Sequence, residues 1–421
     1  ADSPQEIDAV VLTHAHLDHS GWIPRLVKEG YKGPVYATPA TIELCAILLA
    51  DSGHLQEEDA AAHNRNKTSK HDPALPLYTE DDARAAMKQF VPVEFGATRK
   101  VADDFAFRFV PAAHITGSSM AEITLSLAGG TKRLLFTGDI GRLRDTEVAP
   151  GKVAHTGPQE GESCDVLVME STYGNRTHPT EDVRPELAAS IKKTLARGGT
   201  VIIPAFAVER TQKLLFVLKE LMETGQIPRV PVHVDSPMAI KAVQVFLNHT
   251  EEFTDATKAL IAKYGSPLKW EGFSFDLTQQ QSKVINDSRS PQIIVSSSGM
   301  ASGGRILHHL LHRLGDSRNT VMFIGFQSPG TRGQLLQSGA KSIKMFGQTV
   351  EVRTEIVSFQ QFSDHADTPE LLAWLGTFQG APQVTYLVHG DPAAATALQA
   401  AIEAKLHWNV RVAEYLERVE I

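Results

Sequence analysis

The sequence predicts an α/β protein with more than one domain. At 421 residues the chain is longer than a single ordinary hydrophobic core supports. Its apolar runs are short, and in the middle of the chain they alternate with segments of helical character. Such alternation is typical of sheets covered by helices. The 42% hydrophobic and 21% charged residues are those of a globular protein.

The first part of the chain is predicted to be mostly β-strands. Short apolar runs bounded by Gly, Pro or Asp indicate strands. They occur at residues 7–12, 34–37, 105–113, 121–128, 132–137 and 165–170. Between the second and third of these runs the pattern favours helices at 41–50 and 80–90, joined by a polar linker that contains His and Lys.

From residue 181 to 350 strands and helices alternate, which predicts a mostly parallel α/β domain. The strands are expected at 199–204, 230–234, 292–296 and 320–325, and the helices at 186–196, 210–224 and 304–314. After residue 350 we expect another strand pair, a helix at 368–377, a strand at 383–388 and a helix at 393–406.

A cluster of potential metal ligands follows the first apolar run. Residues 13–19 read Thr-His-Ala-His-Leu-Asp-His, directly after the run 9–12. The ligands therefore lie on the loop that leaves a buried strand. Imidazoles combined with one carboxylate are typical of a hydrolytic metal site. The four candidates are His14, His16, Asp18 and His19.

Three more candidate ligands, His114, Asp139 and His389, each follow an apolar strand and lie beside or near a glycine. A single histidine in such a place usually serves as a structural hydrogen-bonding group, but the coincidence with the first cluster favours a shared metal site. Cys45 and Cys164 show no C-x-x-C spacing, so we expect neither a zinc knuckle nor a disulfide framework. A reducing, cytoplasmic location fits this cysteine usage.

These motifs resemble those of a known family. The order H-x-H-x-D-H, then His114, then Gly138-Asp139 resembles the metallo-β-lactamase superfamily. Segments 170–174, 363–367 and 387–390 resemble motifs A, B and C of the β-CASP nucleases. Most similar are the bacterial and archaeal ribonucleases related to the endonuclease subunit of the mRNA 3′-end cleavage and polyadenylation specificity factor.

The resemblance implies a fold and a division of the chain. The fold is an αββα metallo-β-lactamase sandwich interrupted by an α/β β-CASP domain. Residues 1–188 and 351–421 would form the sandwich, and residues 189–350 the insertion. The first strands of the family's sandwich have no counterpart before residue 1, so the N-terminal strands are expected to be missing.

The resemblance also implies roles for the candidate residues. His14, His16 and His114 would hold one metal ion, Asp18, His19 and His389 would hold a second, and Asp139 would bridge them. The expected cofactors are two Zn²⁺, with Mn²⁺ or Fe²⁺ as alternatives. A metal-activated hydroxide would attack phosphorus, with Asp18 among the catalytic residues.

Motifs A and B would supply the acid. His365 would be the general acid for the departing 3′ oxygen, because its reference pKa permits both protonation states near neutral pH. Glu170 would orient His365.

The expected substrate is single-stranded RNA. Residues 189–350 contain 19 Lys and Arg against 11 Asp and Glu, whereas the whole chain has 41 and 49. Glycine-rich turns at 296–305 and 325–333 offer backbone N–H groups to phosphates. The expected contacts are Ser297, Ser298, Gly303, Gly304, Arg305, Thr331 and Arg332. We expect no membrane association, and a homodimer is compatible with the sequence.

Several alternatives stay open. A DNA-processing β-CASP nuclease is disfavoured. The motif C position of such enzymes resembles Val, whereas this chain has His389 there. A thioester or lactam hydrolase would need neither the basic insertion nor His365. A catalytically inactive RNA-processing scaffold subunit remains an alternative. Endonuclease and 5′-exonuclease action are not separated by the sequence.

Overall fold

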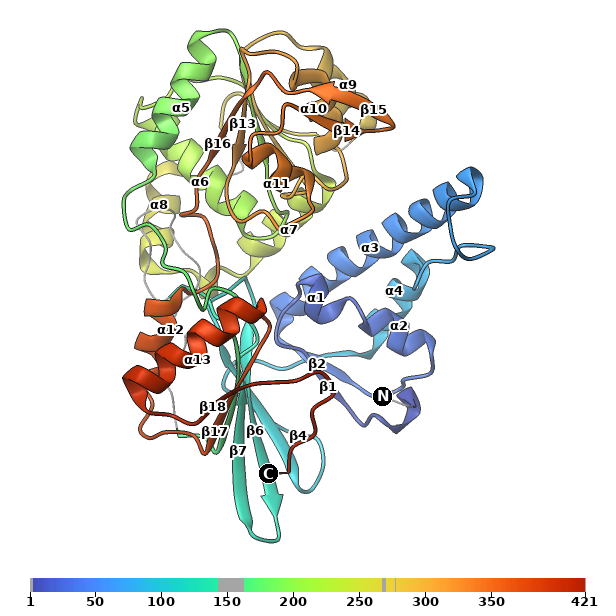
Figure 1. The fold of residues 1–421 in the computed structure, drawn as a ribbon, viewed down its shortest axis with the longest axis vertical. Coiled ribbons are helices and arrows are strands. Elements are labelled where there is room, and N and C mark those ends of the chain that lie inside the picture. The colour runs from blue at the N-terminus through green and yellow to red at the C-terminus, as the bar shows by residue number, and fades with distance from the viewer. Residues whose placement is uncertain (1–2, 143–162, 267–269, 277, 421) are drawn as a thin grey trace. The chain divides into compact units, whose positions relative to one another are not determined.

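The computed structural model describes residues 3–142, 163–266, 270–276 and 278–420, and it divides into two compact α/β units (Figure 1). Among the described residues, the first unit contains those up to 142, 163–177 and those from 365 on, and the second contains 178–364. Within the described part of the chain, no helix has both the length and the apolar character needed to cross a bilayer.

The first unit is built on two sheets. The smaller sheet is parallel and consists of β1 (Val10–Val11), β2 (Val35–Ala37) and β3 (Phe90–Pro92). The larger has the order β18-β17-β8-β7-β6-β5-β4, antiparallel from β4 to β7 and parallel from β7 to β18. Its strands are β4 (Thr98–Lys100), β5 (Phe105–Pro111), β6 (Ser119–Leu127), β7 (Gly130–Phe136), β8 (Val166–Glu170), β17 (Val384–Val388) and β18 (Val410–Val412).

These two sheets pack face to face and are covered by helices on the outside, as the predicted αββα sandwich requires. Tyr36 of the small sheet lies against Phe107 of the large one, with ring centroids 5.3 Å apart. On the other face of the large sheet, Trp374 and Leu398 pack against strand residues. They belong to α12 (Thr368–Leu375) and α13 (Pro392–Leu406), while α1 (Leu17–Ser20), α2 (Ile23–Lys28), α3 (Pro39–Asn66) and α4 (Glu80–Ala86) lie beside the small sheet (Figure 1).

Helix α3 corrects the sequence prediction. A helix was expected at 41–50 with a polar linker after it, but α3 is 28 residues long and reaches Asn66. Residues 55–62 read Leu-Gln-Glu-Glu-Asp-Ala-Ala-Ala, and most of these are strong helix formers although half are polar. Polarity was therefore mistaken for irregular structure. The helix ends where Lys67 adopts a left-handed conformation with φ of 52°.

The helix expected at 80–90 is shorter than predicted. A capping box between Thr79 and Asp82 starts α4, which ends at Ala86. A 3₁₀ turn (Met87–Gln89) then leads into β3, where Phe90 pairs with Val35 of β2. Pairing with the sheet overrides the local helical pattern. Another 3₁₀ turn, Pro4–Glu6, precedes β1.

The second unit contains the predicted parallel sheet, with the order β11-β10-β12-β9-β13-β16. Its strands are β9 (Thr200–Pro204), β10 (Val232–Val234), β11 (Phe273–Phe275), β12 (Gln292–Ser296), β13 (Thr320–Phe323) and β16 (Glu355–Ser358). The helices are α5 (Arg184–Ala196), α6 (Arg210–Glu223), α7 (Pro237–Asn248), α8 (Asp255–Tyr264), α9 (Gln279–Asp287), α10 (Ile306–Arg313) and α11 (Arg332–Gln337), with a 3₁₀ turn at Thr250–Glu252.

The strand pair expected after residue 350 is also corrected. The segment on either side of this point does form strands, but they join different partners. β15 (Gln348–Glu351) pairs with β14 (Ser342–Met345) in a hairpin, whereas β16 extends the parallel sheet beside β13. The hairpin is favoured because Gly347, with φ of 78°, supplies the turn conformation between β14 and β15.

Candidate metal centre and acid

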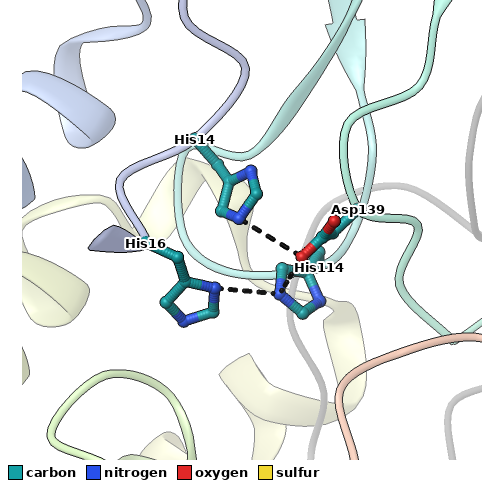
Figure 2. Close-up of side chains that lie close together, drawn as sticks. All are labelled: His14, His16, His114 and Asp139. Carbon is teal, nitrogen blue, oxygen red and sulfur yellow. Dashed lines mark hydrogen bonds and ion pairs between the residues drawn. The ribbon is translucent and has the colours of Figure 1, made fainter. Parts of the chain in front are cut away.

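The structure brings all seven sequence-predicted ligands together in the first unit. They form two groups in which the ligand atoms lie within 4.8 Å of one another. Figure 2 shows the first group, with His14 and His16 on one loop and His114 and Asp139 on two others. The second group is Asp18, His19 and His389. Five of the ligands lie in loops that follow strands, and Asp18 and His19 lie in the short helix α1 just after the loop that carries His14 and His16. The carboxyl edge of the sandwich therefore carries the centre.

Asp139 stands between the two groups and presents one oxygen to each. Its Oδ2 lies 3.5 Å from Nε2 of His14 and 3.5 Å from Nε2 of His114. Its Oδ1 lies 3.3 Å from Nε2 of His19 and 3.3 Å from Nδ1 of His389. The carboxylate is 2% exposed. This arrangement is the geometry expected of a ligand shared by two metal ions.

Two glycines allow the Asp139 loop to pass close to both histidine loops. Gly138 has φ of 53°, and a Cβ there would lie 2.7 Å from the side chain of Thr13, next to His14. A Cβ at Gly141 would lie 1.5 Å from the carbonyl oxygen of Ala113, next to His114. No side chain larger than hydrogen fits at Gly141 unless the loops separate.

The Ser118 hydroxyl supports the loop that carries His114. The Ser118 Oγ accepts hydrogen bonds from the backbone N–H of His114, at 2.8 Å, and of Ile115, at 3.1 Å. The turn before it contains Ala113 with φ of 60°. The strained turn and the double hydrogen bond hold the imidazole at the centre.

Burial keeps the histidines of the first group in the neutral form. Burial lowers the pKa of His14, lowers the pKa of His114 well below its usual value, and lowers the pKa of His16 to about 3. Metal ligation requires neutral imidazole with an available lone pair, so these three side chains are in the required state at neutral pH.

The carboxylates of the centre are ionised. Burial opposes the charge of Asp139, but its close contacts with His14 and His19 outweigh this effect and hold the pKa of this carboxyl well below its usual range. In the second group, the hydrogen bond to Asp18 raises the pKa of His389 to about 9. Metal binding there must displace the proton of His389.

Two unsatisfied atoms indicate that the residues fit metal ions. Nε2 of His14 and Oδ1 of Asp139 are buried and form no hydrogen bond. A buried polar atom without a partner costs about 1–3 kcal/mol. A cation in each ligand group would coordinate both atoms, and the mixture of imidazole and carboxylate suits Zn²⁺ and similar divalent ions.

His365 and Glu170 lie beside the first ligand group. Nδ1 of His365 is 3.2 Å from both carboxylate oxygens of Glu170, and the ring of His365 lies 4.4 Å from that of His114. Glu170 is 1% exposed. Since an ionised carboxylate only accepts hydrogen bonds, Nδ1 is the donor, and Nε2 is on the opposite side of the ring.

The short segment after Asp139 connects these parts, and sequence reasoning missed it. The backbone N–H of Ile140 donates to Oε1 of Glu170 at 2.5 Å, and the Ile140 carbonyl accepts from the N–H of Ala366 at 2.8 Å. Nε of Arg142 donates to Oε2 of Glu370 at 2.7 Å. The sequence does contain a signal for the start of α12, the capping box Asp367-x-x-Glu370, but it does not show that Arg142 contacts Glu370.

Motif A and motif C are joined in the same way. Strands β8 and β17 pair in parallel, with Val388 opposite Glu170. His389 follows with φ of 52°, and its carbonyl oxygen accepts from the Thr172 hydroxyl at 3.0 Å. A Cβ at Gly390 would lie 2.3 Å from the Ser171 hydroxyl, so this glycine permits the close approach.

In the second unit, the two glycine-rich turns lie side by side. The N–H of Gly333 donates to the Met300 carbonyl at 3.0 Å, and Nη1 of Arg332 donates to the Ser302 carbonyl at 3.0 Å. The Ser297 hydroxyl lies 2.6 Å from that of Ser236. Also in these turns are Ser298, whose hydroxyl accepts from the N–H of Ser302, Gly303, Gly304 with φ of 74°, and Thr331, which caps α11.

The two arginines of these turns differ in their partners. Nη1 of Arg305 donates to the Asp235 carboxylate at 2.6 Å and to the Asp276 carbonyl at 2.8 Å. The recorded partners of Arg332 are carbonyl oxygens. Arg305 therefore has a structural task that the sequence did not reveal. Among the described residues, no carboxylate is in an ion pair with Arg332.

Family models match most of the chain. Residues 1–171 match the model of the metallo-β-lactamase superfamily, 211–336 match the Beta-Casp domain, and 349–413 match the Zn-dependent metallo-hydrolase RNA specificity domain.

Named relatives are similar over most of the chain. Ribonuclease TTHA0252 of Thermus thermophilus is 35% identical over 92% of this chain and 82% of its own length. The transcription termination factor FttA of Methanosarcina mazei is 32% identical over 99% of this chain, and that of Pyrococcus abyssi is 30% identical over 99%. The chain spans 63% and 62% of the length of these two factors.

The bridging position of Asp139 predicts a metal-content experiment. Asp139→Ala should lose most of both metal ions, because one carboxylate serves both groups. Asp18→Ala, which removes a ligand from the second group alone, should lose about one ion of two. Elemental analysis of the purified chains measures both. An Asp139→Ala chain that retains the full parental metal content would contradict the bridging role.

The crowding at Gly141 predicts a loss of stability. Gly141→Ala should lower the free energy of unfolding by about 1–3 kcal/mol, as overpacking does, and should reduce the metal content. Gly129→Ala is the matched control, since no atom lies within 4 Å of a Cβ there. Denaturant titration of the two variants checks this. Equal stability and equal metal content in both would show that the loops separate without cost.

Proposed function

Because this chain belongs to the β-CASP branch of the metallo-β-lactamase superfamily, we propose that it is a metal-dependent ribonuclease. It would hydrolyse the phosphodiester bonds of RNA. The observation that carries the proposal is the position of Asp139 between two ligand groups, with the pair Glu170–His365 alongside. Two metal positions next to an acid suit the hydrolysis of an ester with a poor leaving group.

Each residue has a separate task in this proposal. His14, His16 and His114 would hold the first metal ion, Asp18, His19 and His389 the second, and Asp139 both. When bound, the metal ions supply the nucleophilic hydroxide and screen charge on the phosphate. For His365 to act as the acid, a phosphodiester held at these ligands would have to direct its leaving oxygen toward the His365 ring.

His365 would give a proton to the departing 3′ oxygen from Nε2. Glu170 accepts the hydrogen bond from Nδ1, which fixes the orientation of the ring and favours the protonated form needed before the bond breaks. Ile140 and Arg142 hold Glu170 and the start of α12 to the Asp139 loop. The acid and the ligands are thereby kept at a constant separation.

We also propose the finer points of this assignment. Zinc is the metal, in keeping with the imidazole-rich ligand set. Single-stranded RNA is the substrate and the location is cytoplasmic, and the sequence is compatible with a homodimer. As a division of the sequence, we propose residues 1–188 and 351–421 for the metallo-β-lactamase domain and residues 189–350 for the β-CASP insertion. The compact units of the structure instead change at 177/178 and 364/365, so α5 and β16 lie in the second unit. The proposal covers endonuclease and 5′-exonuclease action alike.

The glycine-rich turns of the second unit would bind phosphates of the RNA. They combine backbone N–H groups with the hydroxyls of Ser297, Ser298 and Thr331 and the guanidinium of Arg332. Such contacts are made to the sugar–phosphate backbone, so the sequence preference should be slight.

The acid role predicts how cleavage responds to the leaving group. His365→Ala should leave the metal content unchanged and slow cleavage of end-labelled RNA by about 10²–10⁴-fold. A nitrophenyl phosphodiester, whose leaving group needs no proton, should lose far less. Arg142→Gln should show the same pattern more weakly, because it loosens the position of His365.

Equal losses on the two substrates would mean that His365 is structural or a ligand. A parental chain that holds its metals yet leaves both 5′- and 3′-labelled RNA intact would contradict the proposed activity and favour the scaffold alternative.

The contacts in the turns predict that replacing Arg332 and replacing Arg305 have different effects. Arg332→Gln should weaken RNA binding and reduce the salt dependence, since each lost phosphate contact of a single strand removes about 0.7 from the slope of log K against log salt. Arg305→Gln should in addition lower the melting temperature, because the buried carboxylate of Asp235 loses its cationic partner and keeps only His309 and Ser282. Binding titrations at several salt concentrations and thermal unfolding measure these effects. If a chain with both Arg305→Gln and Arg332→Gln binds RNA as tightly as the parent at every salt concentration, the turns do not contact RNA.

A further inference from the structure

Helix α3 and the chain that returns from it form an arm that the metal centre does not use. We define the arm as residues 51–79, and its tip as residues 63–72. In Figure 1 the distal end of α3 extends beyond α4. A 28-residue helix is about 42 Å long at 1.5 Å per residue. The tip is therefore far along the helix from its first turn.

The first turn of α3 is attached directly to the metal-binding region. The hydroxyls of Thr38 and Thr41 donate to the carbonyl oxygen of Gly117, at 2.6 Å and 2.9 Å. Gly117 lies in the loop that carries His114, and a Cβ at Gly117 would lie 2.6 Å from the backbone nitrogen of Thr41. One end of the helix is thus fixed against the ligands, and the tip is held about 42 Å away along the axis.

Side-chain to backbone hydrogen bonds give the arm a defined shape. Asn64 donates to the Ala74 carbonyl at 2.9 Å and accepts from the Ala74 N–H at 2.7 Å. The N–H of Leu77 donates to Gln56 at 3.1 Å, and the Tyr78 hydroxyl donates to Ser52 at 2.9 Å. Because the arm already has a defined shape, this protein would lose little conformational entropy when a partner binds the tip.

The tip is a cluster of cations that lack acidic partners. Arg65, Lys67 and Lys70 are exposed, and no ion pair is recorded for them in the described part of the chain. Asp72 is the one acidic residue of the tip. Elsewhere in the first unit, exposed cations are often neutralised by a neighbour, as in the pairs Lys28–Asp82, Arg84–Glu80 and Lys100–Asp103.

We propose that the tip of the α3 arm binds the phosphate backbone of RNA at a distance from the scissile bond. The proposal rests on the ribonuclease function and extends it. Unpaired cations on a rigid support suit a polyanion, because phosphates that contact them release condensed counterions. The other side chains of the tip include Asn66, Thr68 and Ser69, which are hydrogen-bonding groups rather than the apolar anchors of a protein interface.

The length of the arm sets the length of RNA that can use it. A stacked strand rises about 3.4 Å per nucleotide, so on the order of twelve nucleotides are needed to cover about 42 Å. Shorter RNA would reach the metal centre without reaching the tip. The arm would therefore make the enzyme prefer long, continuous strands over short fragments.

The test compares a charge-reversed tip with a matched control. The tip variant is Arg65→Glu, Lys67→Glu and Lys70→Glu together. The control is Lys405→Glu, Arg411→Glu and Arg418→Glu, which changes the net charge equally at exposed positions elsewhere in the first unit. Cleavage rates are measured with the metal-loaded full chain on unstructured RNA well above and well below about twelve nucleotides.

The tip variant should raise KM for the long RNA by on the order of ten-fold, with kcat unchanged, and should flatten the salt dependence of binding by about 2 in slope. On the short RNA it should match the parent. Equal KM values for the tip variant and the control on long RNA would overturn the proposal. The tip would then not bind RNA, and a protein partner for the arm would be favoured instead. If the parent cleaves neither RNA, it is the ribonuclease function that fails.

Discussion

The carboxylate of Asp139 is the group on which the rest of the first unit depends. It is almost fully buried, ionised, and in contact with histidines from three separate loops on its two oxygens. A buried charge is tolerated only when it is paired or bound to metal. The loops around it must therefore hold their positions closely, and the glycines at 138 and 141 are what allow the backbones to approach so far.

The same loop extends this constraint to the acid. Within three residues after Asp139, the backbone of Ile140 forms hydrogen bonds with the Glu170 carboxylate and with the N–H of Ala366. Arg142 then forms an ion pair with Glu370. The candidate ligands and the proposed proton donor are consequently not independent features of the sandwich. A change at Gly141 or Arg142 acts on both, although neither side chain coordinates metal in our assignment.

The convergence of the seven candidate ligands was predictable, because each imidazole or carboxylate follows closely after an apolar strand in the sequence. The parallel sheet of the second unit was predictable from its alternating pattern. The length of α3 was not, because helix-forming polar residues look the same in a helix as in a linker. The role of the Ile140 backbone was not, since every residue except proline has the same N–H group. The pairing of Arg305 with Asp235 joins positions 70 residues apart, and no local pattern reveals it.

The pairing of β17 with β8 has a consequence for the order in which the protein becomes active. Val388 lies opposite Glu170, so the strand that presents His389 inserts beside one made more than 200 residues earlier. Ribosomes deliver domains from the N-terminus onward. A nascent chain in which the first six candidate ligands have been synthesised still lacks the seventh and His365. The polypeptide therefore cannot complete its catalytic centre until the ribosome has translated its message as far as His389.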